Sequence, residues 1–453
     1  MEKRDIAIAG PGFVWKPTQS KLRDATTGAF FWLSVFYVVY CARPEDLLLF
    51  AHVPLMAYLP YARISAILAI LSLVLSRGKS KRGMKSLPIE SKYLLAMILL
   101  LFLWAPLSPI WKGGSLLRAA DFGKLYFAWA LTFLLVTSLV RLRRLILIQA
   151  GSVALIAIVS VLKGSSHPRL EGVMGGMYSN PNDLAFAIVL TLPLTLLLLL
   201  TSKSIVRKTA WGLAMLVMMY TLFLTASRAG FIDLVFSGVV MLWFFGVKGR
   251  RPQLIFLTAV LGVLLFIVGG KHLKERFLAL KGSNLQTDLE SSAYGSYEDR
   301  RYLMLRALKG ISEYPLTGLG VRNFPPFSGD WHEVHVTYLQ IAVEGGIPVL
   351  ILYLLFFSSG FRNLKKLRRR RDLDPEARLY VGALYSSLVG FMIGACFAPE
   401  AYQYFPYFTV AYIAALRATA EERESETESS KPPSLNPRFT EAYANNWAVT
   451  VVR

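Results

Sequence analysis

Two residues of the sequence combine a chemically useful side chain with an unusual position. Arg228 lies in Leu224-Thr-Ala-Ser-Arg-Ala-Gly230, between two apolar segments with almost no loop to hold it. His335 lies where a long polar segment returns to an apolar one. A guanidinium binds phosphate through paired hydrogen bonds, and a neutral imidazole accepts a proton near neutral pH. The pair indicates phosphate binding and general-base chemistry. The simpler alternatives are an arginine that extends to lipid headgroups and a polar histidine at a membrane surface.

Further basic residues precede His335. The sequence predicts an amphipathic helix over Asp299 to Tyr314, with Asp299 as its cap, and Pro315 follows it. Arg301 lies on the same helical stripe as the apolar side chains, so we expect it to face the protein and bind phosphate. Arg300 and Arg322 are further candidates, with a solvated helix face as the alternative for Arg300. Asn180 and Asn182 precede another apolar segment and are candidates for substrate binding or for an ordinary helix cap.

Metal chemistry has little support in the pattern. His332 and His335 are three residues apart, whereas the zincin signature places its histidines four apart on a helix. The Asp-x-Asp motif, Asp372-Leu-Asp374, lies in a basic loop away from every other candidate. We therefore predict a site that uses no metal and no cofactor.

The composition indicates a membrane protein. Of the 453 residues, 54% are hydrophobic and only 17% are charged, against about 25% charged in soluble domains. The net charge of +21 would raise nucleic acid as a partner of a soluble protein, but in a membrane protein it reflects basic cytoplasmic loops. We expect the lipid bilayer as a partner and no nucleic acid.

Apolar runs of about 20 residues, the length needed to cross a bilayer, recur along the chain. They predict an all-α, polytopic membrane protein of about twelve transmembrane helices. The predicted spans are 28–46, 57–76, 93–111, 122–140, 145–162, 184–201, 209–227, 229–247, 253–270, 342–361, 379–398 and 402–417.

Basic residues set the predicted orientation. Lys and Arg gather in the loop after every even-numbered span, so both termini are expected in the cytoplasm and the large loop at about 271–335 outside. The chain divides into a cytoplasmic segment (1–27), a membrane domain (28–417) and a charged, Ser/Pro-rich cytoplasmic tail (418–453) that we expect to be disordered. Cys41 and Cys396 would lie near one membrane face, so a single bridge between them stays open.

Four motifs together resemble the O-antigen ligase and O-antigen polymerase superfamily. The resemblance covers about residues 170–360 in order and spacing. One departure is Val336, where the family often has Asn after the histidine. The motifs are Asn180-Pro-Asn182, Thr225-Ala-Ser-Arg228, Arg301 opening a helix that runs into Tyr314-Pro-Leu-Thr-Gly-Leu-Gly320, and His335-Val-Thr-Tyr-Leu-Gln-Ile-Ala-Val-Glu-Gly-Gly346.

The resemblance implies a transferase of lipopolysaccharide biosynthesis in the bacterial inner membrane. Such an enzyme moves a glycan from undecaprenyl diphosphate to an acceptor hydroxyl at the periplasmic face. Carried over, His335 would be the general base, and Arg228 and Arg301 would hold the diphosphate. Tyr338 and Glu344 belong to the matched histidine motif and are possible substrate ligands. A base opposite the leaving group predicts inversion at the anomeric carbon, and lipid A-core is the favoured acceptor.

Two groups of alternatives remain at this stage. An O-antigen or exopolysaccharide polymerase and a protein O-glycosylation ligase share the same motifs. From another class, a twelve-helix secondary transporter would show internal repeats and ionisable groups at the bilayer midplane. Here the candidate groups gather at one face, and Lys124 is the main charge inside a span. This favours interfacial chemistry over transport.

Overall fold

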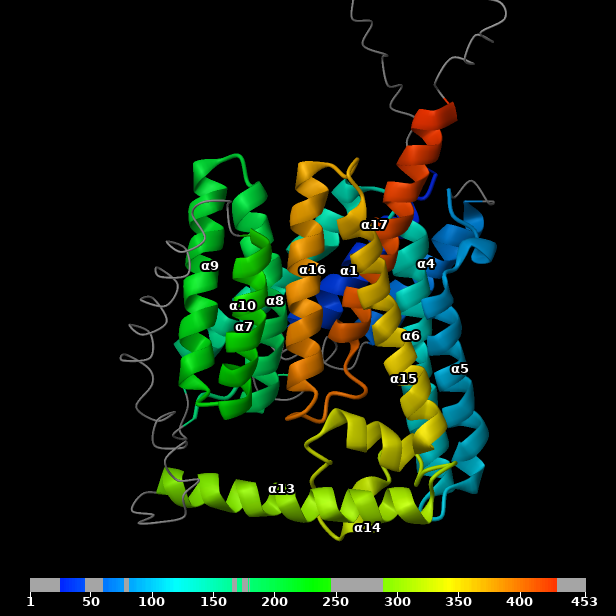
Figure 1. Cartoon of the computed structure of the whole chain (residues 1–453), viewed down its shortest axis with the longest axis vertical. Helices are drawn as coiled ribbons and strands as arrows, with labels where there is room; N and C mark the ends of the chain where they lie inside the picture. The colour runs from blue at the N-terminus through cyan, green and yellow to red at the C-terminus, as the bar shows by residue number, and fades with distance from the viewer. Residues whose placement is uncertain are drawn as a thin grey trace, which may run out of the picture.

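The computed structural model is a bundle of helices crossed at one end by the long helix α13 (Figure 1). It describes residues 25–44, 60–76, 81–164, 169–172, 178, 180–245 and 288–429, and no strand occurs in these ranges. The predicted all-helical class is therefore confirmed for this part of the chain.

Helices overlap every predicted span except 253–270, which lies outside the described residues. The helices are α1 (Thr27–Ala42), α4 (Tyr61–Leu75), α5 (Ile89–Trp104), α6 (Lys112–Leu135), α7 (Leu139–Lys163), α8 (Pro181–Thr201), α9 (Ile205–Leu224), α10 (Arg228–Phe245), α13 (Asp288–Glu313), α14 (Phe324–Ser328), α15 (Thr337–Arg369), α16 (Pro375–Gly394) and α17 (Tyr404–Ser429). Two 3₁₀ turns, η2 (Met84–Ser86) and η3 (Ala105–Leu107), flank α5.

Among the described residues, five helical segments are long and apolar enough to cross a membrane: Ile89–Leu107, α7, α8, α15 and α16. The helices α1 and α4 are apolar but shorter. The chain is thus a multi-pass membrane protein, while the count of about twelve spans and the side on which each loop lies remain predictions.

Helix α8 is largely buried and packs against α7, α9, α10 and α16. Its sequence is apolar on all sides, as expected of a helix with neighbours all round. Asn180 caps its start, because the side-chain oxygen accepts a hydrogen bond from the Asn182 backbone N–H at 2.9 Å. Pro181 follows at the first helical position, where a missing N–H costs nothing. This start carries Asn182 to the end of the bundle crossed by α13.

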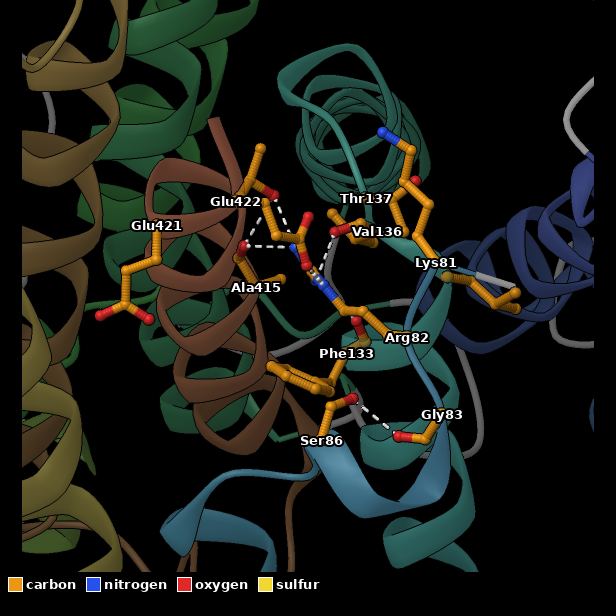
Figure 2. A network of polar contacts seen from close by, with 12 residues as sticks. Lys81, Arg82, Gly83, Ser86, Phe133, Val136, Thr137, Ala415, Glu421 and Glu422 are labelled. Atoms are coloured by element: carbon orange, nitrogen blue, oxygen red, sulfur yellow. Dashed lines mark hydrogen bonds and ion pairs between the residues drawn. The ribbon is translucent and has the colours of Figure 1, made fainter. Parts of the chain in front are cut away.

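The opposite end is fastened by Arg82, whose side chain is 2% exposed. Figure 2 shows its guanidinium between the end of α6 and the side of α17. The acceptors are the carbonyls of Phe133 (2.9 Å) and Val136 (2.8 Å), the hydroxyl of Thr419 (2.8 Å) and the carboxylate of Glu422 (2.6 Å). Helix α17 continues to Ser429, so residues 418–429, which the sequence predicts to begin a disordered tail, are helical.

Helix α13 differs from the sequence prediction at its start. It begins at Asp288, so Asp299 lies inside the helix and the prediction that Asp299 caps it is wrong. It ends at Glu313, just before Pro315, as the sequence indicates. The predicted loop before residue 288 lies outside the described residues.

The buried stripe of α13 is also not the predicted one. The predicted apolar stripe is largely exposed, with Tyr302 at 48%, Leu305 at 56% and Leu308 at 48%. The buried stripe contains Leu303, Ala307 and Gly310. A Cβ on Gly310 would lie 2.7 Å from a methyl of Val343, so only a glycine lets α13 come this close to α15. Both stripes of α13 contain apolar residues. The stripe that packs against α15 is the one with the small residues Ala307 and Gly310.

Helix α15 is interrupted at Gly346, where the backbone takes φ 78° and ψ 171°. The interruption exposes carbonyls that would otherwise accept bonds within the helix. The Leu319 N–H donates to the Val343 carbonyl at 2.8 Å, and the Gly320 N–H donates to the Glu344 carbonyl at 2.9 Å. The Gly-rich turn after α13 is thereby fixed against α15. Cys41 and Cys396 are both free thiols, so the structure contains no bridge between them.

Candidate functional site

Three arginines from distant segments gather at the α13 end of the bundle, and we call them the basic cluster: Arg169, Arg228 and Arg300. All three are half-buried. Burial and the nearby charges of Arg300 and Arg228 lower the pKa of Arg169 to about 10. Burial and the charge of Arg228 lower the pKa of Arg300 to about 10. Half-buried guanidinium groups near one another give this end of the bundle a positive potential, although the charge of Glu171 acts on Arg169 in the opposite sense.

Asn182 is the polar residue that organises one side of the basic cluster. Its side-chain oxygen accepts hydrogen bonds from the Arg169 guanidinium and from the Ser227 hydroxyl, each at 2.9 Å. Arg169 also donates from Nε to the Thr225 carbonyl at 3.0 Å. The asparagine expected near the site thus positions an arginine, while the exposed Asn180 serves as the helix cap.

Arg228 lies in the near-zero connection that the sequence indicates. Helix α9 ends at Leu224 and α10 begins at Arg228. The turn is tight enough to place Ala226 at φ 47°, a conformation that L residues rarely adopt. The Ser227 hydroxyl accepts the Gly230 N–H at 3.2 Å and supports the first turn of α10. Arg228 therefore lies at the first residue of α10, at the end of the bundle that α13 crosses.

Two consecutive arginines on α13, Arg300 and Arg301, differ in burial. Arg300 is half-buried, and its Nε has no hydrogen-bond acceptor. Arg301, expected to face the protein, is exposed because the packed stripe of α13 differs from the predicted one. Arg322 is also exposed, and its charge acts on Glu333. Of the arginines singled out from the sequence, Arg228 and Arg300 come together, and Arg301 and Arg322 lie outside the basic cluster.

The residues just before and just after His335 in the sequence are held in place by the protein. The preceding residue, Val334, is buried in a small core formed largely under α13. Two residues later, the Thr337 N–H donates to the Ala395 carbonyl at 2.8 Å, and its hydroxyl donates to the Ala398 carbonyl at 2.6 Å. The imidazole is half-buried, and its Nδ1 has no hydrogen-bond partner. These contacts fix the backbone on either side of His335, which limits the ordering that substrate binding would require.

The surroundings of His335 keep it neutral. Its pKa is lowered to about 4, first by burial and then by the positive charge of Arg300. His332 has a different set of contacts: its Nδ1 lies 2.7 Å from the Asp330 carboxylate, and its ring packs on Trp331 with 3.6 Å between centroids. The two histidine rings are 6.1 Å apart. His335 Nδ1, by contrast, has no hydrogen-bond partner in the structure.

Tyr338 and Glu344 have structural partners. The Tyr338 hydroxyl donates to the Met392 carbonyl at 2.6 Å, which ties α15 to α16. Glu344 is fully buried and accepts a 2.6 Å hydrogen bond from the Tyr402 hydroxyl. These bonds brace the segment that follows His335.

Sequence reasoning missed Arg169. The residue belongs to Ser165-Ser-His-Pro-Arg-Leu-Glu-Gly172, a short polar loop that shows no family motif. The signal that could have found it is its place after α7, because the alternation of basic loops puts this loop on the same face as Arg228. Within the described ranges, no group of three or more His, Cys, Asp or Glu residues could hold a metal ion.

A comparison with protein families gives a match to part of the chain. The O-antigen ligase family model matches residues 213–354. The match includes Arg228, Arg300 and His335, and it excludes Arg169 and Asn182. A search of the curated proteins finds no match to the chain. The resemblance to the O-antigen ligase superfamily is confirmed over the matched residues.

Proposed function

We propose that this O-antigen-ligase-like membrane protein transfers a glycan from undecaprenyl diphosphate to an acceptor hydroxyl. The observation that carries the proposal is the basic cluster beside a clamped, neutral His335 whose Nδ1 has no partner. The α13 end of the bundle would be the periplasmic face of the inner membrane, which the basic loops at the other end support. The acceptor we propose is lipid A-core.

The basic cluster would bind the diphosphate of the donor. Guanidinium groups form paired, charge-assisted hydrogen bonds with phosphate oxygens. Arg300 and Arg169 are half-buried, so their attraction for an anion is weakened less by solvent than at an open surface. As the bond between the sugar and the diphosphate breaks, negative charge grows on the leaving oxygen. The arginines stabilise that charge without a metal ion.

His335 would then remove the proton of the acceptor hydroxyl. The oxygen attacks the anomeric carbon, the bond from that carbon to the diphosphate oxygen breaks, and the diphosphate leaves with the electron pair. Attack opposite the leaving group inverts the anomeric configuration. The proton resides on the imidazole and passes to solvent after product release.

Donor binding would also make His335 a stronger base. In the empty site burial, and then the charge of Arg300, lower its pKa to about 4, which favours the neutral form but makes it a weak acceptor of protons. A bound diphosphate offsets the charge of Arg300, so the part of the shift caused by that charge is reduced and the pKa of His335 rises. Base strength therefore increases only when the donor is in place, which protects the enzyme against unproductive chemistry.

The experiment uses the full-length protein in lipid nanodiscs with a donor of glycan-linked undecaprenyl diphosphate and purified lipid A-core. Release of undecaprenyl diphosphate and a product with the summed mass of both glycans are expected. The stereochemistry of the new bond is read by NMR, and inversion is expected. Release without any glycosylated acceptor, or a retained anomeric configuration, would contradict the proposal. A product extended on the lipid carrier would instead identify a polymerase.

A further inference from the structure

Two carboxyl groups meet beside the segment that carries His335. Glu333 lies two residues before His335 in the loop between α14 and α15, and Glu344 lies on α15. The two carboxyl groups lie within hydrogen-bonding reach of each other. Glu344 is fully buried, and Glu333 is half-buried. The proposed transfer mechanism assigns no role to either side chain.

The contact between Glu333 and Glu344 requires a proton. Glu333 Oε2 and Glu344 Oε1 are buried, and within the described part of the chain neither accepts a hydrogen bond from an N–H or a hydroxyl group. An ionised carboxyl group can only accept hydrogen bonds, so two ionised carboxyl groups cannot bond to each other. One proton held between them lets one group donate to the other. Without that proton, two like charges would face each other in a partly dehydrated place.

Groups from three other segments act on this carboxyl pair. The Tyr402 hydroxyl, in the loop between α16 and α17, donates to Glu344 Oε2 at 2.6 Å. Arg322, between α13 and α14, and Arg118, on α6, place positive charge near Glu333. Burial raises the pKa of Glu333 above its ordinary value, and the charges of Arg322 and Arg118 oppose this effect without reversing it. The pair therefore keeps a proton in conditions where an exposed glutamate would lose it.

The carboxyl pair connects the loop of His335 to a packed part of the bundle. The Glu333 backbone lies against the His335 imidazole. On the other side, the Tyr402 ring that donates to Glu344 packs edge-on against Phe122 of α6, with 5.1 Å between centroids. Glu344 and its donor are thus held independently of the loop. A hydrogen bond from one carboxyl group to the other therefore fixes the backbone that contacts the imidazole.

We propose that Glu333 and Glu344 share one proton and that the resulting hydrogen bond positions His335 for proton transfer. The proposal rests on the proposed function and adds two positioning residues to it. As the pH rises, the shared proton passes to solvent and leaves two negative charges that repel each other. The loop then moves away from α15, and His335 loses its place beside the acceptor. Turnover should therefore decline at alkaline pH, separately from the acid limb that His335 sets.

Hydrogen exchange of the full-length protein in nanodiscs tests the contact without any substrate. After correction for the intrinsic exchange rate, the backbone amides of residues 329–336 should be protected until the pair loses its proton and less protected at higher pH. Glu333→Gln should stay protected throughout, because a carboxamide donates without a titratable proton. Glu313→Gln, at an exposed position at the end of α13, is the matched control and should behave as the wild type. Protection that does not change with pH in the wild type, or that changes equally in Glu333→Gln, would overturn the proposal.

Turnover measurements connect the contact to His335. Glu333→Ala should lower kcat about 10- to 100-fold, the cost of a misplaced reacting group, while KM for the donor and the binding of inorganic pyrophosphate stay unchanged. Glu333→Gln should restore most of kcat near neutral pH and abolish the alkaline decline. Glu344→Gln can also bond across the pair without a shared proton, so it should give the same profile and replaces Glu333→Gln if that variant fails to fold.

The two measurements separate this inference from the proposed function. An alkaline decline that persists in both glutamine variants, or a Glu333→Ala protein with wild-type kcat, would overturn the positioning role alone. Amide protection that follows the expected pH dependence, in a wild-type protein that transfers no glycan, would support the shared proton and overturn the proposed function.

Discussion

Arg82 and Arg300 place the same guanidinium group in two contrasting settings at opposite ends of the bundle. Arg82 meets two backbone carbonyls, a hydroxyl and a carboxylate. Figure 2 shows Phe133, Val136 and Glu422 around it. Arg300 has an Nε without an acceptor, and the nearby charge that acts on it is that of another arginine, Arg228. The protein itself supplies acceptors and a negative charge for Arg82. The charge near Arg300 is the positive charge of Arg228.

A structural arginine and a functional arginine differ in whether the protein supplies their hydrogen-bond acceptors. Removing a buried charge whose hydrogen bonds are met within the protein leaves its partners unsatisfied and destabilises the fold. A cluster of like charges costs stability, and such a cluster is a candidate site for an anionic ligand. The comparison predicts that variants at the two ends fail in different ways.

The largest effect is expected for His335→Ala, at the crowded end. Transfer should fall about 10²–10⁴-fold, the usual contribution of a general base, while donor binding changes little. Donor binding and turnover are measured separately on purified protein. His332→Ala is the control, because its ring already contacts Asp330, and it should retain most activity. Loss of turnover in the control alone would move the base to His332.

Arg300→Gln removes the positive charge of the half-buried arginine on α13. Turnover should fall about 10²–10³-fold with normal expression and thermal stability, since an electrostatic ligand of the leaving group is lost. Arg301→Gln is the adjacent control and should stay within about twofold of wild type, because Arg301 is exposed. Arg300→Lys should recover little, since a point charge lacks the paired donors. Equal losses in both glutamine variants would show that position on α13 does not matter.

Arg82→Gln should fail in the opposite way. We expect roughly 2–4 kcal/mol of lost stability, because two carbonyls, Thr419 and Glu422 lose a buried donor. Chemical unfolding in detergent measures the change, and the fraction that remains folded should keep its specific activity. Lys81→Gln, which removes an exposed ion pair with Glu426, is the control and should be nearly neutral. A folded but inactive Arg82→Gln protein would contradict the claim that Arg82 acts on stability alone.

The smallest effect concerns pH. The acid limb of kcat/KM reports the empty site and should lie near pH 4, because the pKa of His335 there is lowered to about 4. The acid limb of kcat reports the donor complex and should lie at higher pH, since the diphosphate offsets the charge of Arg300. In both cases activity falls as pH drops, because the imidazolium cannot accept a proton. Acid limbs at the same pH would contradict the coupling between donor binding and base strength.

The sequence predicted the helices well because long apolar runs have few other stable states in a bilayer. It also singled out Arg228 and His335, which stand out against their apolar neighbours, and their roles remain predictions. It chose Arg301 over Arg300 because both stripes of α13 carry apolar residues, and the close approach at Gly310 that selects one stripe depends on Val343 in another helix. Arg169 escaped notice because its place beside Arg228 and Arg300 depends on contacts between distant segments.

Binding of inorganic pyrophosphate to the full-length protein in nanodiscs tests the central claim most directly, because it needs neither the acceptor nor the glycan. Isothermal titration should show binding that weakens at least tenfold in Arg300→Gln, Arg228→Gln and Arg169→Gln, and that is unchanged in Arg301→Gln and Arg82→Gln. The affinity should also fall with added salt, as expected of charge-assisted contacts. Absent binding in the wild-type protein, or binding that survives all three substitutions in the basic cluster, would contradict the account.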